Sequence, residues 1–459
     1  MEDREASVER SRGCLKVLLW GAGVLLVIVL VVIAIAGTFA RRANSSVAAE
    51  IARMKAAGEP TSWADLAPAK IPDSENGAVD ILAAEKEIAD FPAEDIKWLE
   101  KLELAGDEAP APADVERARD ILKRLSGPLD RVRAGLAKPR AVYPLDYGTV
   151  SNQWPTPDLT AIRRLARLLQ KEACIAALDG SGDSAAARSA EIYRLGNTLS
   201  DQPALITQLV AVALHAISED AAENTIARTR VSPAVLRSLS RLFATGPEEE
   251  RKAFATALRG ERAHLMSISD ELSKGNMGIL TGGPARSPSA SSTNPFARFW
   301  ARYDEKTYLG MFRGWIGSLD ASRITYPLQP WTAPKTPMLA TLSTAMAMTG
   351  SYQKIPKDLT SRTAHMRTAA AGLEVAARIA EGGAAPADLS SFDKDVSTDP
   401  FTAKPLLIKN DGTTWTVYSA GANLKDDGAP VNTGSGRSRQ VNSDDIAFRV
   451  PLKGPAAVK

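Results

Sequence analysis

An uncharged stretch near the start of the chain constrains its architecture more than any other feature. Between Lys16 and Arg41 lie 24 residues without a charged side chain, including the apolar run Val24 to Ile35. As a helix at about 1.5 Å per residue, this stretch spans roughly 36 Å, which is enough to cross the hydrocarbon core of a bilayer. The sequence therefore predicts a transmembrane anchor over residues 17–40.

A cleaved signal peptide is the alternative, because Ala34-Ile35-Ala36 has the small-x-small form that signal peptidase accepts. The apolar region exceeds the usual limit of about 15 residues, which favours a retained anchor. Four basic residues precede the stretch and only Arg41 and Arg42 follow it closely, which favours a cytoplasmic N-terminus. We expect a cytoplasmic tail (1–16) and a single-pass protein of the bacterial cell membrane, with the bulk of the chain extracytoplasmic.

Charge and cysteine content exclude several classes of protein. The 459 residues include 56 Lys+Arg and 54 Asp+Glu, so the formal charge is only +2 and no nucleic-acid partner is implied. Hydrophobic residues make up 44% of the chain, enough for a large core. The two cysteines, Cys14 and Cys174, are predicted to lie on opposite sides of the membrane, so they cannot form an intramolecular disulfide.

Residues 41–392 are predicted to form an irregular α-helical hairpin body. Over Asp158 to Leu178, apolar residues recur every three or four positions, and Ala185 to Leu199 has the pattern of an antiparallel partner. The charge-free stretch Gln202 to Ser218 is too short for a second span and indicates a buried helix, with Leu205, Leu209, Val212 and Ile217 inside. Further helices are predicted over Ala78 to Ala89, Asp114 to Leu125, Pro233 to Phe243, Pro247 to Leu272 and Leu359 to Ala380.

A loop rich in Gly, Ser and Pro is predicted over residues 275–295, and an aromatic-rich segment follows it over residues 296–331. These aromatics, interleaved with arginines, could stack on the sugar rings of a glycan. The spacing of Phe296, Trp300 and Tyr303 is also that of one helix face, which favours packing against other helices. Both interpretations remain open from the sequence.

The sequence contains no strong catalytic motif. Its three histidines, His215, His264 and His365, lie in different predicted helices and match no zinc motif. Ser351-Tyr-Gln-Lys354 matches the Ser-x-x-Lys pattern of penicillin-recognising enzymes, but it lacks companion motifs and the same pattern recurs at Ser391. We therefore assign no catalytic and no cofactor-binding residue, and whether the chain is an enzyme stays open.

The chain changes character at residue 393, where a small β-rich module (393–459) begins. All of its acidic residues are Asp, and strands are predicted over Leu406 to Lys409, Thr414 to Ser419 and Ile446 to Val450. Asp411-Gly412 between the first two runs indicates a tight hairpin, because glycine tolerates positive φ.

Five short motifs in this module occur in the order Asp399-Pro400-Phe401, Lys404-Pro405-Leu406, Val417 to Asn423, Asp426-Asp427-Gly428 and Asp444-Asp445-Ile446. In this order, over about the last 60 residues, the chain resembles the C-terminal region of type II secretion major pseudopilins. The resemblance implies an Asp-rich loop that binds calcium and an association with secretion. Asn423 stands where the family usually has Asp.

The residue types also indicate calcium binding, because this hard cation prefers carboxylate and carbonyl oxygens. The predicted metal ligands are Asn423, Asp426, Asp427, Asp444 and Asp445. The alternative is that these residues only solvate turns.

Two functional hypotheses follow from the sequence. The first is an envelope interaction or scaffold protein, with the lipid bilayer and an envelope protein as partners and a calcium-stabilised C-terminal module. The second is an envelope enzyme or glycan-binding protein that uses the aromatic-rich segment, with a small-molecule substrate that the sequence does not identify. Buried aromatics without a polar pocket would favour the first hypothesis, and concave aromatics beside paired carboxylates the second.

Overall fold

The computed structural model describes most of the predicted extracytoplasmic body and only parts of the N-terminal stretch. The described residues are 20, 24–28, 30–31, 37–38, 41–42, 44–104, 110–151, 153–274, 276, 278–279, 295–321, 326–331, 352–383, 385–429 and 444–452, with the backbone alone for 295–303. Most of the predicted loop 275–295 lies outside these residues, as does Cys14.

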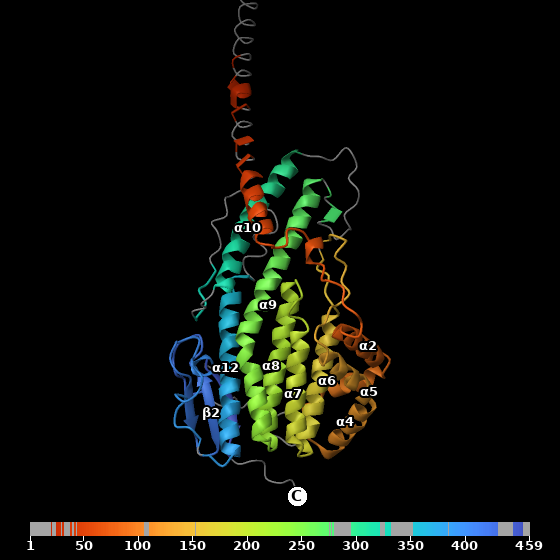
Figure 1. Ribbon diagram of the computed structural model, residues 1–459, viewed down its shortest axis with the longest axis vertical. Coiled ribbons are helices and arrows are strands. Elements are labelled where there is room, and N and C mark those ends of the chain that lie inside the picture. Colours follow the sequence, from red (N-terminus) through yellow and green to blue (C-terminus); the bar gives the residue numbers. More distant parts are fainter. Residues whose placement is uncertain are drawn as a thin grey trace, which may run out of the picture.

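The fold is mainly α, as predicted, with one small sheet at the C-terminal end of the chain. Long helices lie side by side along a rod (Figure 1). The rod contains α6 (Leu159–Leu178), α7 (Gly182–Asn197), α8 (Leu205–Arg228), α9 (Pro233–Ser273), α10 (Pro295–Asp320) and α12 (Ile355–Ala380).

Shorter helices cover one flank of the rod beside α6 (Figure 1). They are the 3-10 turn η1 (Ala64–Leu66), which touches α9, and α2 (Gly77–Ala89), α3 (Ala93–Lys101), α4 (Pro112–Arg124) and α5 (Ser126–Leu136). The buried residues of α2, α3, α4 and α5 join those of α6, α7 and α8 in one hydrophobic cluster. The sequence predicted α2 and α4 but not the short helices α3 and α5.

The predicted hairpin of α6 and α7 is present, and local chemistry explains where its helices begin and end. Asp158 caps α6 by accepting hydrogen bonds from Thr160 N at 2.9 Å and Ala161 N at 3.0 Å. Gly180 ends the turn with φ +77°, which an L side chain rarely adopts. Helix α7 then starts at Gly182, three residues before the predicted boundary.

Helix α9 corrects the prediction of two helices separated at Pro247. It runs unbroken for 41 residues with Pro247 inside it. Proline removes one backbone donor and normally disfavours a helix interior. Here Gly246 is buried against Tyr193 and Met366, and burial continues on both sides at Phe243 and Glu250, so tertiary packing outweighs the local cost.

Helix α8 is buried, as predicted for the charge-free stretch. Among the described residues it is the one helix long and apolar enough to cross a membrane, yet 61% of its apolar window is buried inside the protein. Thr207, Gln208 and His215 are all buried. Leu209 was expected inside but is 44% exposed, because the neighbouring helices cover the opposite face of α8.

The C-terminal sheet is antiparallel with the order β1 (Leu407–Asn410), β2 (Thr414–Ser419), β3 (Ile446–Pro451). Gly412 has φ +89° in the predicted hairpin turn. A single helical turn, α13 (Lys394–Ser397), precedes the sheet. The sheet packs on α12, where a Cβ at Gly372 would lie 2.3 Å from the ring of Phe448.

The N-terminal residues that the structure describes are helical, and residues 44–56 pack against α9 and α10 through Val47 and Met54. These residues and the beginning of α10 lie at the end of the rod opposite the sheet (Figure 1).

Candidate functional site

The predicted metal ligands come together at one end of the sheet. Asn423, Asp426 and Asp427 follow β2, whereas Asp444 and Asp445 immediately precede β3. Because Ser419 at the end of β2 pairs with Ile446 at the start of β3, the two groups meet there.

Hydrogen bonds connect three of these residues to one another and tie a fourth, Asp426, to its surroundings. Asn423 Nδ2 donates to Asp427 Oδ2 at 2.8 Å, and the Asp427 backbone N contacts Asp445 Oδ1 at 3.5 Å. Asp426 Oδ1 accepts from the Tyr418 hydroxyl at 3.1 Å and from Gly428 N at 2.9 Å. The loop is therefore held by its own polar groups.

Asp444 contributes its backbone to the loop instead. A Cβ at Gly421, where φ is +64°, would lie only 1.9 Å from the Asp444 carbonyl oxygen. This close approach requires glycine at position 421.

The carboxylates of this loop repel one another. Burial raises the pKa of Asp445, and the charges of Asp427 and Asp426 raise it further against the effect of two backbone hydrogen bonds. Burial and the hydrogen bond to Asp426 raise the pKa of Tyr418 to about 12. Lys409 supplies a nearby cation, whose Nζ donates to the carbonyl oxygens of Gly428 and Ala429.

The loop offers the oxygen donors that calcium prefers, but their arrangement is not that of a closed metal site. Calcium takes six to eight oxygens at about 2.3–2.6 Å. Within the described ranges, no group of three or more His, Cys, Asp or Glu side chains is placed to hold a metal ion. Calcium binding by these residues therefore stays a prediction.

Asp399 ties the Asp-Pro-Phe turn to the start of the same loop. Its carboxylate is 2% exposed and accepts from Phe401 N at 2.9 Å, Ser419 Oγ at 2.8 Å and Ala420 N at 3.2 Å. Two of the quoted sequence motifs, separated along the chain, are thus in direct contact.

A buried charge network in the rod is the feature that sequence reasoning missed. Arg362 of α12 donates to Glu219 of α8 at 2.7 and 3.2 Å, and its Nη2 lies 3.6 Å from Glu250 of α9. None of the three residues is more than 9% exposed. Burial raises the pKa of Glu219, whereas the charges of Arg362 and His215 hold the pKa of Glu250 below its usual value despite burial.

His215 extends this network through both of its ring nitrogens. Its Nδ1 lies 2.7 Å from Glu250 Oε1, and its Nε2 lies 3.0 Å from Asn197 Oδ1. The Asn197 amide donates its Nδ2 to Glu249 at 3.3 Å, which directs its oxygen toward the ring. Each ring nitrogen therefore lies within hydrogen-bonding distance of a side-chain oxygen on another helix.

The three histidines do not form one site. His264 of α9 lies in a separate aromatic cluster, stacked on Trp154 with ring centroids 4.0 Å apart. Its Nε2 contacts Ser151 O at 2.8 Å, and burial lowers its pKa to about 4. A neutral, enclosed imidazole of this kind packs the core.

The aromatic-rich segment is largely core where its side chains are described. Tyr308, Phe312, Trp315 and Trp331 are each at most 8% exposed, and Trp315 stacks on Trp331 with centroids 5.3 Å apart. Such enclosed rings are not available to stack on a sugar. The described part of this segment therefore gives no support to glycan binding.

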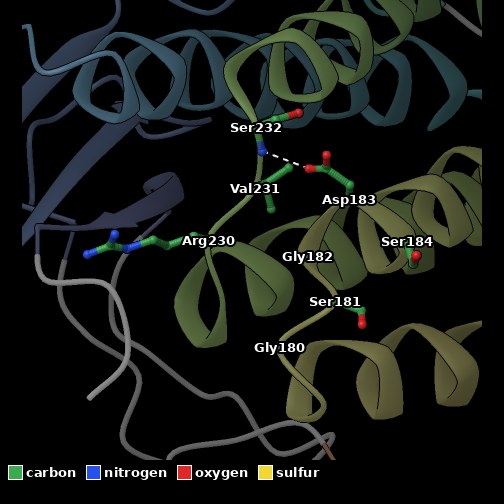
Figure 2. Close-up of a pocket in the computed structure, with 8 residues that line it drawn as sticks. All are labelled: Gly180, Ser181, Gly182, Asp183, Ser184, Arg230, Val231 and Ser232. Carbon is green, nitrogen blue, oxygen red and sulfur yellow. Dashed lines mark hydrogen bonds between the residues drawn. The ribbon is translucent and has the colours of Figure 1, made fainter. Parts of the chain in front are cut away.

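Figure 2 shows a surface depression of about 480 Å³ beside the α6–α7 turn. Asp183 Oδ1 accepts from Ser232 N at 2.7 Å, which joins this turn to the start of α9, and Arg230 points away from Asp183. The lining of this depression contains Ser181 and Ser184 but no histidine that could activate their hydroxyl groups. A second depression, of about 640 Å³, lies between residues 55–66 and α9, with lining residues of both charges.

No family model matches the chain, and comparisons with curated proteins and with solved structures also found no match. The resemblance to pseudopilins therefore rests on the residues quoted above.

Proposed function

We propose that this chain is a single-pass protein of the bacterial envelope that acts as an interaction or scaffold module. Residues 17–40 anchor it in the membrane, and the helical rod carries the C-terminal module away from the lipid. An association with secretion follows from the pseudopilin-like motifs of that module.

Uniform exposure of apolar side chains near the N-terminus carries this proposal. Val24, Leu25, Leu26, Val27 and Ile28 are helical, and each is between 48% and 63% exposed. Successive helical residues point about 100° apart, so four in a row face every side of the helix. None of the described residues buries these side chains, and lipid is the solvent that suits them.

The choice of a scaffold over an enzyme rests on burial. The described aromatics of the segment 296–331 are mostly core residues, and the buried charge network does not line either of the two depressions. Reactive groups that substrate cannot reach stabilise a fold and do not catalyse.

Membrane fractionation tests the anchor. We expect the full chain to remain in the membrane pellet after alkaline extraction, and a chain carrying Leu26→Arg and Val27→Arg to be released, because each charge at a helix centre costs about 2.5–3.5 kcal/mol of insertion free energy. The control, Leu26→Ala with Val27→Ala, should stay in the pellet. Recovery of the unaltered chain in the soluble fraction would contradict the proposal.

Calcium binding is a second part of the proposal, supported by the mutual repulsion of Asp426, Asp427 and Asp445. We expect calcium to raise the unfolding temperature of the detergent-solubilised full chain, and a chelator to reverse the rise, because bound cation stabilises only the folded loop. Asp445→Asn should weaken the effect.

Asp411→Asn is the matched control for charge, because Asp411 lies in the β1–β2 turn of the same module. An unfolding temperature that is unchanged by calcium in the unaltered chain would remove calcium from the proposal and leave the anchor untouched. Crosslinking in native membranes then identifies the partner, with secretion components as the expected neighbours.

A further inference from the structure

The first turns of α10 lie at the same end of the rod as the proposed anchor, and their sequence suits a membrane surface. Residues 295–303 read Pro-Phe-Ala-Arg-Phe-Trp-Ala-Arg-Tyr, with four aromatic and two basic residues and no acidic one. Aromatic residues are enriched where a bilayer meets water, and basic residues there are attracted to anionic headgroups.

The N-terminal helix and α10 run in the same direction. Arg313 of α10 pairs with Glu50 at 3.2 Å. Farther from the anchor, Asp320 at the end of α10 pairs with Arg259, one turn of α9 away from Arg262, which pairs with Glu59 at 2.7 Å. Both segments therefore advance together along α9, from the anchor toward the sheet.

Because the N-terminal helix and α10 run in the same direction, we can compare how far each extends toward the anchor. Pro295 precedes Arg313 by 18 residues, about 27 Å of helix, whereas Arg42 precedes Glu50 by only 8 residues, about 12 Å. The start of α10 thus reaches at least as far toward the anchor as Arg42 does. Figure 1 shows both segments at this end of the molecule.

We propose that residues 295–303 of α10 are a second membrane contact, in which a helical tip lies in the headgroup region of the bilayer that holds the anchor. The occupant of this surface is anionic lipid, because the segment carries two basic residues and no acidic one among aromatics that favour the bilayer interface. This inference rests on the anchor proposed above and adds the orientation of the rod: upright, with two attachments.

Fluorescent labels at single cysteines test the contact in the full chain. The chain carries Cys14→Ser and is reconstituted in nanodiscs of anionic lipid, and Cys174 stays unlabelled because it is buried. Labels are placed in three variants, Phe299→Cys in the tip, Val27→Cys in the anchor and Gly314→Cys lower on α10. A side chain at Gly314 meets nothing within 4 Å, so this control should fold normally.

Lipids carrying a nitroxide near the headgroup should quench the label at position 299 severalfold more than the label at 314, and lipids carrying it deep in the acyl chain should quench the label at 27. Replacing anionic with zwitterionic lipid should reduce quenching at 299 and leave it unchanged at 27.

Three outcomes would overturn the contact. Quenching at 27 with none at 299 removes the α10 contact and leaves the anchor. A label at 299 that is shielded from aqueous iodide but not quenched by lipid indicates a protein partner instead. Absence of quenching at both 27 and 299 removes the anchor, and this inference falls with it.

Discussion

At the scale of single residues, the rod depends on charges that water does not reach. Arg362 holds Glu219 and Glu250 between three helices, and His215 contacts Glu250. Buried carboxylates without polar partners would be costly, because desolvation of an unpaired ion costs several kcal/mol. The contacts of Arg362 with both carboxylates and of His215 with Glu250 explain how these side chains can be enclosed together.

Glu261 is a buried acid whose hydrogen bonds come from two neutral donors, and it predicts a pH dependence of stability. It accepts from Leu205 N at 2.9 Å and from the Tyr352 hydroxyl at 2.5 Å, and burial raises its pKa from 4.5 to about 7. Between these two values the folded state holds a proton that the unfolded state has lost. Stability attributable to this group is therefore complete below pH 4.5 and declines as the pH rises to about 7.

We expect Glu261→Gln to remove this decline, since an amide keeps the shape and does not ionise. The free energy of unfolding of the unaltered protein should fall relative to the variant by about 3 kcal/mol across this range. Urea unfolding at several pH values measures the difference. Parallel pH profiles for the two proteins would show that Glu261 does not titrate in this way.

At the scale of elements, glycines determine how closely the helices approach. Gly260 of α9 lies where the chain enters α8, and a Cβ there would be 2.1 Å from the Pro203 carbonyl oxygen. Backbone cannot move aside as a flexible side chain can. The contact between α8 and α9 therefore requires glycine at this position.

Gly260→Ala should destabilise the protein by about 1–3 kcal/mol, because the added methyl group would force α8 and α9 apart. Gly314→Ala on α10 is the control, with nothing within 4 Å of the new atom. It should stabilise the protein by about 0.5–1 kcal/mol through its higher helix propensity. Thermal unfolding that ranks the two variants in the opposite order would refute the packing argument.

The elements that the sequence predicted well are those with local signals. Asp158 before a periodic apolar run located α6, and Asp411-Gly412 located the hairpin. Pro247 gave a false break in α9, because its effect is decided by packing against distant residues. Leu209 was placed inside because the apolar pattern of α8 does not reveal which face its neighbours cover.

The acidic loop and the buried charge network also differ in how far the sequence could reveal them. The acidic loop could be found from residue types alone, because its members lie in two short runs at the ends of paired strands. The buried network could not, since Glu219 and Arg362 are 143 positions apart and each resembles a solvated surface charge in the sequence. Only the fold makes them partners.

At the scale of the whole molecule, the sheet and the rod share a core. Phe448 and Val450 of β3 belong to the same cluster as Leu236 and Phe243 of α9 and Leu373 of α12. A module with a core of its own would unfold separately, whereas a shared core couples the two. The predicted boundary at residue 393 is thus a change of secondary structure within one packed body.

We expect calorimetry of the full chain in detergent to give a single transition for sheet and rod. Phe448→Ala should lower its temperature, with a loss of about 3–5 kcal/mol, because the cavity lies between the sheet and α12. Leu424→Ala is the control in the same module, at a side chain that is 59% exposed, and should have little effect. Two transitions, with only one shifted by Phe448→Ala, would show independent units.

The unbroken length of α9 sets the distance between the two ends of the rod. Its 41 residues form a helix about 60 Å long, and α12 packs alongside α9 and carries the sheet on its flank (Figure 1). With the proposed anchor in lipid at the opposite end of the rod, the acidic loop would lie at a fixed distance from the bilayer surface. Under the proposed function, a partner that binds this loop would have to extend toward it from the next layer of the envelope or carry a membrane-anchored stalk of similar length.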